Sequence, residues 1–310
     1  SGVVQPMAEL NAAEGGDFIN VPFYKANLSG DFEVLSDSSS LTPGKITADK
    51  QIGVILHRGR AFEARDLAAL AAGSDPMAAI GQKIGEYVAN QRQKDLLSCL
   101  AGVFGSLGTT SSSAAFFGLT IDGESGDSPS VLSPRHVAEA KALLGDQGEK
   151  LTAMCVHSKV YYDLVERRAI DFIYDNTGAA DTGATQGSTA NAFGSPSVPT
   201  FMGLRVIVSD DVQTSGSGAS TEYATYFFTQ GAVASGEQLA MQTETDRDIL
   251  AKSDAMSIDL HYCYHPVGSK WAVTDTNPSR ATLETVGNWS KVYETKNLGI
   301  VRATNLSNMD

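Results

Sequence analysis

Three residues with metal-binding side chains lie close together near the C-terminal end of the chain. His261, Cys263 and His265 alternate with apolar residues, and imidazole and thiolate are ligands that zinc prefers. In an extended strand, however, residues two apart have Cα atoms about 6.5 Å from each other. That spacing is awkward for three ligands of one tetrahedral ion, and no CxxC or HExxH motif is present. We therefore interpret the three side chains as the polar face of a strand and predict no metal site.

Other residues with potential chemistry give no stronger signal. Asp122, Glu124 and Asp127 surround glycines that do not fall at the offsets of a calcium-binding EF-hand, so a solvated turn is the favoured interpretation. The nucleophile motif GxSxG and the nucleotide motifs GxGxxG and GxxxxGK[ST] are absent. The sequence therefore predicts no catalytic residues, no cofactor and no enzymatic activity.

A small basic cluster, Arg58, Arg60 and Arg65, could contact phosphate. We expect it instead to pair with acidic residues of the same or a neighbouring chain. The three glycosylation sequons, at Asn27, Asn288 and Asn305, occur at the frequency expected by chance.

Composition narrows the class of protein. The chain has 310 residues, of which 42% are hydrophobic and 19% charged, as in ordered globular proteins. A net charge of −13 gives no general attraction for phosphate, which disfavours tight nucleic-acid binding. The three cysteines, Cys99, Cys155 and Cys263, are far apart and odd in number, which favours a reducing compartment over a disulfide framework. No apolar run approaches the length of a membrane helix, and no secretory signal is recognised.

One long helix organises the rest of the chain. Ser74, Asp75 and Pro76 form a helix start, and apolar residues then recur at helical spacing up to Phe104. Two apolar groups are separated by a polar middle from Asn90 to Asp95, which we expect to be solvated. Gly102 and Gly105 are candidate stop signals. At 1.5 Å per residue the helix is about 45 Å long. We expect it to rest on two different structures, one for each apolar group.

Strands and shorter helices surround this helix in the expected order. Residues 18–23 are extended, and a long excursion follows whose returning strand covers 51–62. The strict alternation at 256–265 predicts an antiparallel strand with one packed and one solvated face. We expect helices at 63–72, at 158–173 and after Ser133-Pro134, and strands at 151–156, 200–209, 223–228 and 299–303. This order indicates an α+β protein whose two subdomains exchange chain more than once.

Several local phrases of this layout resemble major capsid proteins of tailed bacteriophages. They are DFINVPF (17–23), GDFEVLSD (30–37), PGKIT (43–47), LHRGRAF (56–62), DLAALAAGSDPM (66–77), VHSKVYYDL (156–164) and YETKNLGIVR (293–302). The resemblance covers nearly the whole chain and implies the Hong Kong 97-type capsid fold. That fold has an N-terminal arm, an extended loop called the E-loop, a peripheral domain with a long spine helix, and an axial domain.

The resemblance places these parts as follows. The arm would be 1–24, the E-loop 25–60, the peripheral domain 61–132 and 243–265, and the axial domain 133–242 and 266–310. Inter-subunit contacts are expected from seven E-loop residues: Phe32, Val34, Leu35, Leu41, Lys45, Ile52 and Val54. Some members of the fold crosslink a loop lysine to a neighbouring asparagine. Lys45 and Lys50 lie in the corresponding loop, but no partner asparagine or helping acid can be matched.

The resemblance implies a structural protein that forms pentamers and hexamers of an icosahedral head around double-stranded DNA. Implied partners are further copies of the chain and the portal, scaffolding and cement proteins, with DNA enclosed but not specifically bound and no membrane. No long coiled-coil segment is predicted before the arm, so a fused scaffolding domain is expected to be absent or to have been removed before Ser1. Assembly is expected in the host bacterial cytoplasm, and the product in the virion. An encapsulin-like compartment is the alternative, and a cytosolic hydrolase is a third hypothesis from another class.

Overall fold

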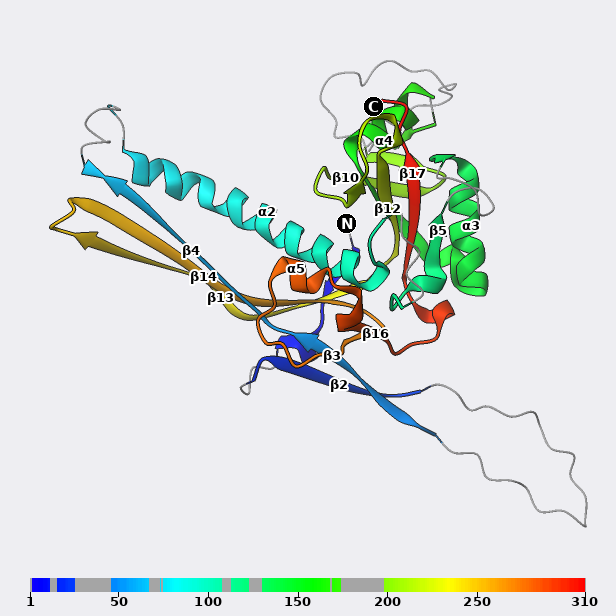
Figure 1. Cartoon of the computed structure of the whole chain (residues 1–310), viewed down its shortest axis with the longest axis horizontal. Coiled ribbons are helices and arrows are strands. Elements are labelled where there is room, and N and C mark those ends of the chain that lie inside the picture. Colours follow the sequence, from blue (N-terminus) through cyan, green and yellow to red (C-terminus); the bar gives the residue numbers. More distant parts are fainter. Residues whose placement is uncertain are drawn as a thin grey trace, which may run out of the picture. The chain divides into compact units, whose positions relative to one another are not determined.

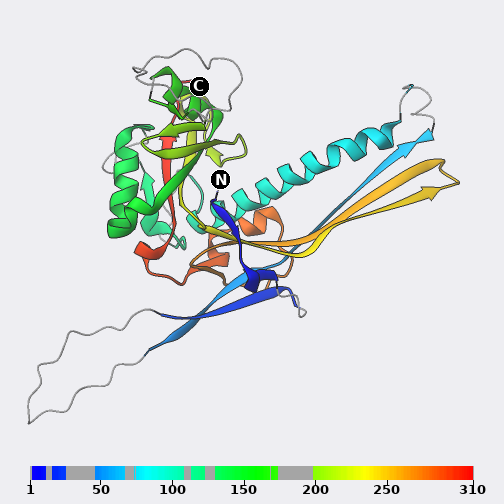
Figure 2. The same ribbon diagram turned by 180° about the vertical axis from the view of Figure 1, so that it is seen from behind.

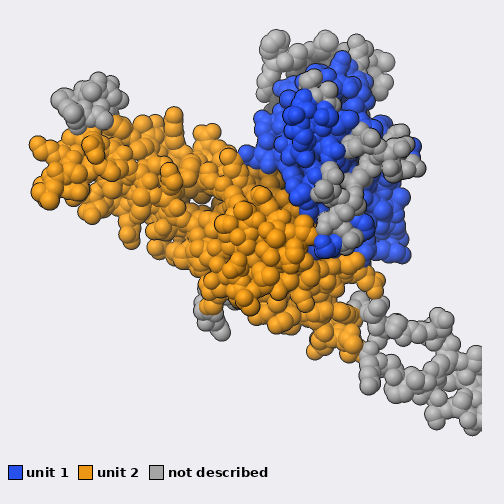
Figure 3. Space-filling model, viewed as in Figure 1, with its two compact units in different colours: residues 1–5, 104–233, 295–310 blue, residues 6–103, 234–294 orange. Residues whose placement is uncertain are grey.

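The protein is described from a computed structural model, which places residues 2–11, 16–25, 46–66, 73, 75–107, 113–122, 130–167, 169–173 and 198–309. The described chain divides into two compact units, coloured separately in Figure 3. Unit 1 contains residues 1–5, 104–233 and 295–310, and unit 2 contains residues 6–103 and 234–294. Each unit therefore collects segments that are distant in sequence, as the predicted exchange of chain requires.

Unit 2 is built on helix α2 (Pro76–Phe104), of which all but the last residue belong to this unit. Figures 1 and 2 both show α2 running beside strands β4 (Leu56–Arg65) and β14 (Ser253–Pro266). These strands belong to a sheet of order β1-β13-β14-β4, with β1 at Val4–Pro6 and β13 at Val233–Asp248. The other described elements of unit 2 are β2 (Phe18–Tyr24), β3 (Ala48–Val54), β15 (Ser269–Trp271), β16 (Trp289–Lys291) and α5 (Arg280–Leu283), with the short 3-10 helices η1 (Ala8–Asn11) and η6 (Val286–Asn288).

Helix α2 forms where the sequence predicts the long helix, and Asp75 caps it through its side chain and the backbone N–H of Met77, at 2.9 Å. The two apolar groups differ in depth. The second group is buried, from Leu97 to Phe104, whereas the first group, from Met77 to Val88, is only half-buried. The predicted stop at Gly102 is wrong, because the helix passes through this residue and ends at Phe104, before Gly105 with its φ of 86°.

The polar middle of α2 is not solvated as predicted, because it contains a buried carboxylate. Asp95 is fully buried and accepts hydrogen bonds from Arg58 Nε on β4 at 3.3 Å, from Arg280 Nε on α5 at 2.5 Å and from the Tyr262 hydroxyl on β14 at 2.5 Å. Burial and the hydrogen bond to Asp95 raise the pKa of Tyr262, which keeps this hydroxyl a donor. Arg280 also donates to Gln91 Oε1 at 2.8 Å. One carboxylate therefore joins four elements of unit 2.

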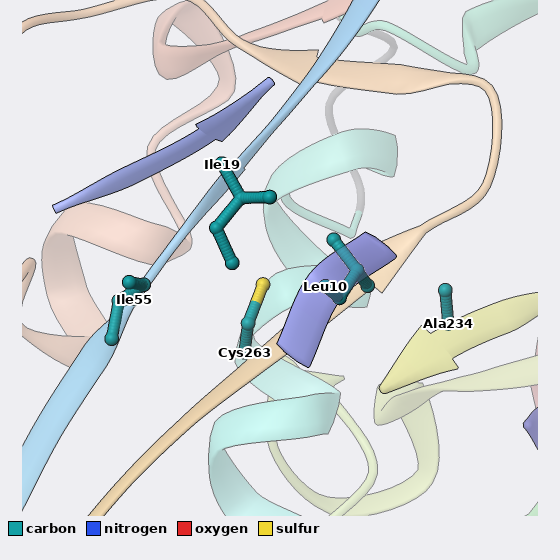
Figure 4. Packing of buried hydrophobic residues seen from close by; sticks show 5 residues of the cluster. All are labelled: Leu10, Ile19, Ile55, Ala234 and Cys263. Atoms are coloured by element: carbon teal, nitrogen blue, oxygen red, sulfur yellow. The ribbon is translucent and has the colours of Figure 1, made fainter. Parts of the chain in front are cut away.

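Strand β14 confirms the predicted strand but not its solvated face. Asp259 is exposed and His261 half-buried, as expected, but Cys263 and His265 on the same face are buried. Figure 4 shows the reason: Cys263 lies in a buried apolar cluster with Leu10, Ile19, Ile55 and Ala234. The face of β14 that carries Asp259, His261, Cys263 and His265 is therefore solvated at its N-terminal end and buried at its C-terminal end.

Unit 1 is organised around strand β12 (Glu222–Thr229), whose residues 223–228 are all buried. The sheet has the order β5-β17-β12-β7-β10-β9-β8, with β11 beside β12 and β6 beside β17. Its strands are β5 (Thr120–Asp122), β6 (Ser130–Val131), β7 (Leu151–Val156), β8 (Asp171–Ile173), β9 (Val198–Phe201), β10 (Leu204–Val208), β11 (Thr214–Ser215) and β17 (Ile300–Leu306). β12 runs antiparallel to both β17 and β7, while β10 runs parallel to β7. A strand buried on both faces reads as a continuous apolar run, as YATYFF does here.

Among its described residues, unit 1 has the helices α3 (Pro134–Leu144) and α4 (Ser158–Glu166), with the 3-10 helices η2 (Phe117–Leu119), η3 (Gly145–Lys150), η5 (Gly218–Ser220) and η7 (Thr295–Asn297). The predicted start of α3 is confirmed, and Ser133 forms a capping box with His136, whose Nδ1 lies 3.0 Å from the Ser133 hydroxyl. Helix α4 is shorter than the predicted 158–173, because Asp171–Ile173 forms strand β8 against β9.

Two further predictions need correction. The predicted strand 200–209 is a hairpin of β9 and β10, because Met202 and Gly203 have φ values of 49° and 81° and reverse the chain. The helix predicted to begin at Glu63 does not begin there, since β4 continues to Arg65 in register with β14. Residues 67–72 of that predicted helix lie outside the described residues.

The predicted arm, E-loop, peripheral domain and axial domain are defined by their positions in an assembled shell. This division therefore stays a prediction. The compact units are defined by packing within one chain, with boundaries at 5/6, 103/104, 233/234 and 294/295.

Gly102 provides a test of how closely α2 packs in unit 2. A Cβ on Gly102 would overlap the carbonyl oxygen of Leu283 and lie 2.5 Å from Nε1 of Trp289, whereas a Cβ on Gly85 of the same helix meets nothing within 4 Å. We expect Gly102→Ala to lower the free energy of unfolding by about 2–3 kcal/mol. Gly85→Ala should raise it by about 0.5–1 kcal/mol, through helix propensity. Urea unfolding followed by tryptophan fluorescence measures both, and equal signs for the two variants would contradict the packing described.

The Asp95 cluster gives a second prediction. Asp95→Asn leaves Arg58 and Arg280 without their carboxylate, and we expect a loss of about 2–4 kcal/mol in the free energy of unfolding. Glu86→Gln on the same helix, where the side chain is exposed, is the control and should be nearly neutral. The two tryptophans, Trp271 and Trp289, are both buried in unit 2 and report on its unfolding. A neutral Asp95→Asn variant would show that the cluster contributes little.

Candidate assembly surfaces

The base of the β2–β3 hairpin is fixed in unit 2. The two strands pair antiparallel from Phe18 opposite Val54 to Tyr24 opposite Ala48. Gln51 on β3 is 4% exposed, and its amide donates to the Tyr293 hydroxyl at 2.8 Å. Its carbonyl oxygen accepts from the backbone N–H of Gly268 at 2.9 Å and lies 3.1 Å from His265 Nε2. Gln51 thus anchors β3, which lies within the predicted E-loop, to the rest of unit 2.

The far end of this hairpin is exposed. Tyr24 at the end of β2 is 73% exposed, and Ile46, two residues before β3, is 58% exposed. Both are large apolar side chains. Lys25 Nζ lies 2.9 Å from Asp49 Oδ2, and this lysine lowers the pKa of Asp49. A partly exposed pair of this kind contributes little to stability. Apolar side chains and open strand edges here are available to another surface.

The structure describes two of the seven predicted contact residues. Ile52 is half-buried on β3, and Val54 is 2% exposed and therefore has little surface left for a neighbour. The other five, Phe32, Val34, Leu35, Leu41 and Lys45, lie outside the described residues. Lys50 is exposed on β3. Contact of these residues with a neighbouring subunit stays a prediction.

A second surface, which the sequence reading missed, is the end of the β13–β14 ribbon. All residues from 240 to 252 are exposed, and Ile249 and Leu250 in the turn are 80% and 96% exposed. Arg247 lies across the ribbon, with Nη2 at 2.7 Å from Asp66 Oδ2 and Nη1 at 2.8 Å from Asp254 Oδ1, and these bonds raise the pKa of Arg247. In the sequence, Ile249 and Leu250 are an apolar pair between two charged stretches. This pattern indicates a contact surface only once the pair is known to lie in an exposed turn.

Open strand edges accompany both surfaces. β13 has sixteen residues and its outer neighbour β1 has three, so among the described residues most of that edge lacks a partner strand. The β2–β3 sheet has two strands, each with an outer edge. Exposed edges are templates for pairing with another chain. A protein that assembles can use such edges, whereas a monomer must protect them.

The three candidate metal ligands do not come together. His261 packs against His57, with ring centroids 4.2 Å apart, Cys263 is in the apolar cluster of Figure 4, and His265 bonds to Gln51. His57 Nε2 lies 3.3 Å from Asp17 Oδ1. Within the described ranges no group of three or more His, Cys, Asp or Glu side chains could hold a metal ion. Among these residues also no helix has the length and hydropathy to cross a membrane.

The basic cluster pairs in part as predicted. Arg58 binds Asp95, and Arg65 lies 3.9 Å from Glu63. Arg60 has no hydrogen bond or ion pair to another described residue. No arrangement of nucleophile, base and orienting group emerges from the described side chains.

Comparison with known proteins identifies the family of this chain. Residues 9–299 match the family described as Gp13-like, major capsid protein 13-like. The chain belongs to this family. The major capsid protein of Bacillus phage SPP1 is 33% identical over 312 residues, which cover 97% of this chain and 88% of that relative. The resemblance found in the sequence is therefore confirmed, and the chain is a major capsid protein of a tailed phage.

Solved structures confirm the fold of this capsid protein. The cyanophage Pam1 capsid asymmetric unit matches with a TM-score of 0.63 at 14% identity, covering 99% of this chain and 89% of that chain. The capsid of Ralstonia phage GP4 matches with a TM-score of 0.58 at 10% identity, covering 99% and 87%. The α+β, Hong Kong 97-type fold predicted from the resemblance is thus confirmed. The comparisons give no support to an encapsulin-like shell.

The buried imidazole beside Gln51 gives a prediction for pH. Burial lowers the pKa of His265 from 6.5 to about 4. As the pH falls from 6.5 to 4, the unfolded capsid protein binds a proton at this position and the folded one does not, so stability falls in this window by up to about 3 kcal/mol. His265→Gln cannot titrate and should flatten the dependence of the free energy of unfolding on pH between 6.5 and 4. An unchanged pH dependence would show that His265 is not its source.

Proposed function

We propose that this capsid protein assembles as pentamers and hexamers into the icosahedral head that encloses the double-stranded DNA of a tailed phage. The observation that carries the proposal is the 33% identity to the SPP1 major capsid protein across 97% of the chain. The family is one of structural proteins, and a role without enzymatic activity agrees with the absence of the catalytic motifs sought in the sequence.

The surfaces of the chain suit this role. Ile249 and Leu250 at the end of the β13–β14 ribbon expose apolar area, and burying such a side chain contributes about 1.5–3 kcal/mol. The open edges of β2, β3 and β13 can accept further strands. We infer that both the hairpin and the ribbon end bind neighbouring copies, in addition to the seven E-loop residues predicted from the resemblance.

The acidic charge supports enclosure of DNA without specific binding. At −13 the chain lacks the excess of basic residues that phosphate-binding proteins use. DNA would be confined by the wall and not held by it. The portal, scaffolding and cement proteins complete the proposed set of partners, with assembly in the host bacterial cytoplasm and the product in the virion.

Electron microscopy of particles purified from infected cells tests the proposal. We expect closed shells of uniform size whose absorbance at 260 nm indicates packaged nucleic acid. Shells filled with protein cargo and free of DNA would favour an encapsulin-like compartment, and failure to form any shell would contradict the proposal.

The ribbon end gives a more specific prediction. Leu250→Asp should fold like the parent chain, because Leu250 is 96% exposed, but it should assemble at least about tenfold more slowly or less completely. Leu250→Met keeps the apolar surface and is the matched control. Light scattering measures assembly, and circular dichroism checks the fold. Parental assembly by Leu250→Asp would show that the ribbon end is not a contact.

A further inference from the structure

A cavity in unit 2 collects four arginine side chains of an acidic protein. It has a volume of about 90 Å³ and lies between α2 and the β4–β14 strands, with an apolar wall formed by residues such as Tyr87, Ile258 and Leu260. The arginines at its lining are Arg58 and Arg60 of β4, Arg92 of α2 and Arg280 of α5. The four arginines thus come from three elements of unit 2 that are separate in sequence.

The charges around the cavity do not balance. Asp95 is the one carboxylate among the described lining residues, and it pairs with Arg58 and Arg280. Glu237 pairs with Arg92, with the two atoms 2.9 Å apart. Four guanidinium groups thus face two carboxylates, which leaves an excess of two positive charges. In a chain with a net charge of −13, such a local excess is the opposite of the general surface.

Two of the arginines have guanidinium N–H groups without an acceptor among the described residues. Arg92 lies over the Tyr262 ring at 4.8 Å and binds Glu237 through Nη2, but its Nε is buried without a hydrogen-bond partner. The guanidinium group of Arg60 has no hydrogen bond or ion pair to a described residue. Buried donors in folded proteins are normally paired, so the unpaired Nε of Arg92 indicates a missing acceptor. Arg60 is exposed, and its guanidinium group is available to the same acceptor.

The other two arginines are held in place. Asp95 fixes Arg58 and Arg280, while Asn277 Oδ1 at 3.0 Å and the carbonyl of Pro278 at 2.7 Å take further donors of Arg58. These groups add positive potential without needing to move. Water could occupy the cavity, but it would leave the two excess charges uncompensated. An oxyanion supplies both acceptors and charge, and guanidinium groups bind phosphate with strong, charge-assisted hydrogen bonds.

We propose that this cavity is a binding site for one inorganic phosphate ion, with Arg60 and Arg92 as its ligands and Arg58 and Arg280 as supporting charges. The volume agrees with this assignment, because a water molecule needs about 10–15 Å³ measured in the same way and a tetrahedral ion is only a few times larger. Bound phosphate joins α2 to β4 at the point where Asp95 already joins them.

The test is equilibrium dialysis of the full-length, unassembled chain with radiolabelled phosphate at constant ionic strength set with sodium chloride. We expect saturable binding of one phosphate per chain with a dissociation constant on the order of 1 mM. Arg60→Gln and Arg92→Gln should each weaken binding at least about tenfold. Arg65→Gln, also on β4 but paired with Glu63 away from the cavity lining, is the matched control and should bind like the parent.

Folding of each variant is checked by circular dichroism and tryptophan fluorescence. Should Arg92→Gln fail to fold, Arg60→Gln decides alone, because Arg60 has no partner within the described chain to lose. The absence of saturable binding by the parent, or an unchanged affinity in Arg60→Gln, would overturn the proposal. Equal weakening of phosphate binding by Arg65→Gln would also overturn the proposal, since the loss of any positive charge would then have the same effect.

Discussion

The arrangement of unit 2 depends on one buried carboxylate, that of Asp95 on α2. A fully buried charge is costly unless donors surround it, and here Arg58, Arg280 and Tyr262 supply them from β4, α5 and β14. These donors lie 37, 185 and 167 residues away in the sequence. The carboxylate can therefore be buried only when the long helix lies in one register against the sheet. Apolar contacts alone would allow α2 to shift by one turn against the sheet, whereas the hydrogen bonds of Asp95 would be lost. The cluster therefore fixes the position of α2, whose first half is only half-buried.

The two ends of α2 are held by different kinds of contact. From Leu97 onwards the helix has an apolar core around it, and Gly102 allows the backbone to approach the carbonyl of Leu283 and the Trp289 ring. Toward Pro76 the helix and the β13–β14 ribbon form a thin layer with exposed residues on the ribbon from 240 to 252. A thin layer buries little area within its own chain. Specific polar contacts, such as Asp95 with its arginines and Arg247 with Asp66 and Asp254, then fix geometry that a core would otherwise fix.

The sequence predicted elements whose signal is local. The 3.6-residue period from Ser74 to Phe104, the alternation at 256–265, the Ser133-Pro134 start and the strand at 151–156 each correspond to an observed element. It did not predict what distant partners decide. β4 extends to Arg65 because β14 offers it a partner, and Asp171–Ile173 leaves the helix because β9 pairs with it. The burial of Asp95 could not be read from a polar run, since its donors are far away in sequence, and the solvated appearance of Cys263 and His265 hides a core formed by the hairpin base.

The candidate surfaces were still harder to predict, for a physical reason. Residues that contact other copies look, within one chain, like exposed residues without a function, and only their position distinguishes them. Ile249 and Leu250 become notable because they occupy the turn of a solvated ribbon, where no core of their own chain can reach them. One such contact is weak, and subunits of charge −13 repel one another, although salt screens this repulsion beyond about 10 Å at 0.1 M. In the proposed assembly each copy would repeat every contact, so that weak apolar contacts would together suffice for a stable wall while each one stays reversible.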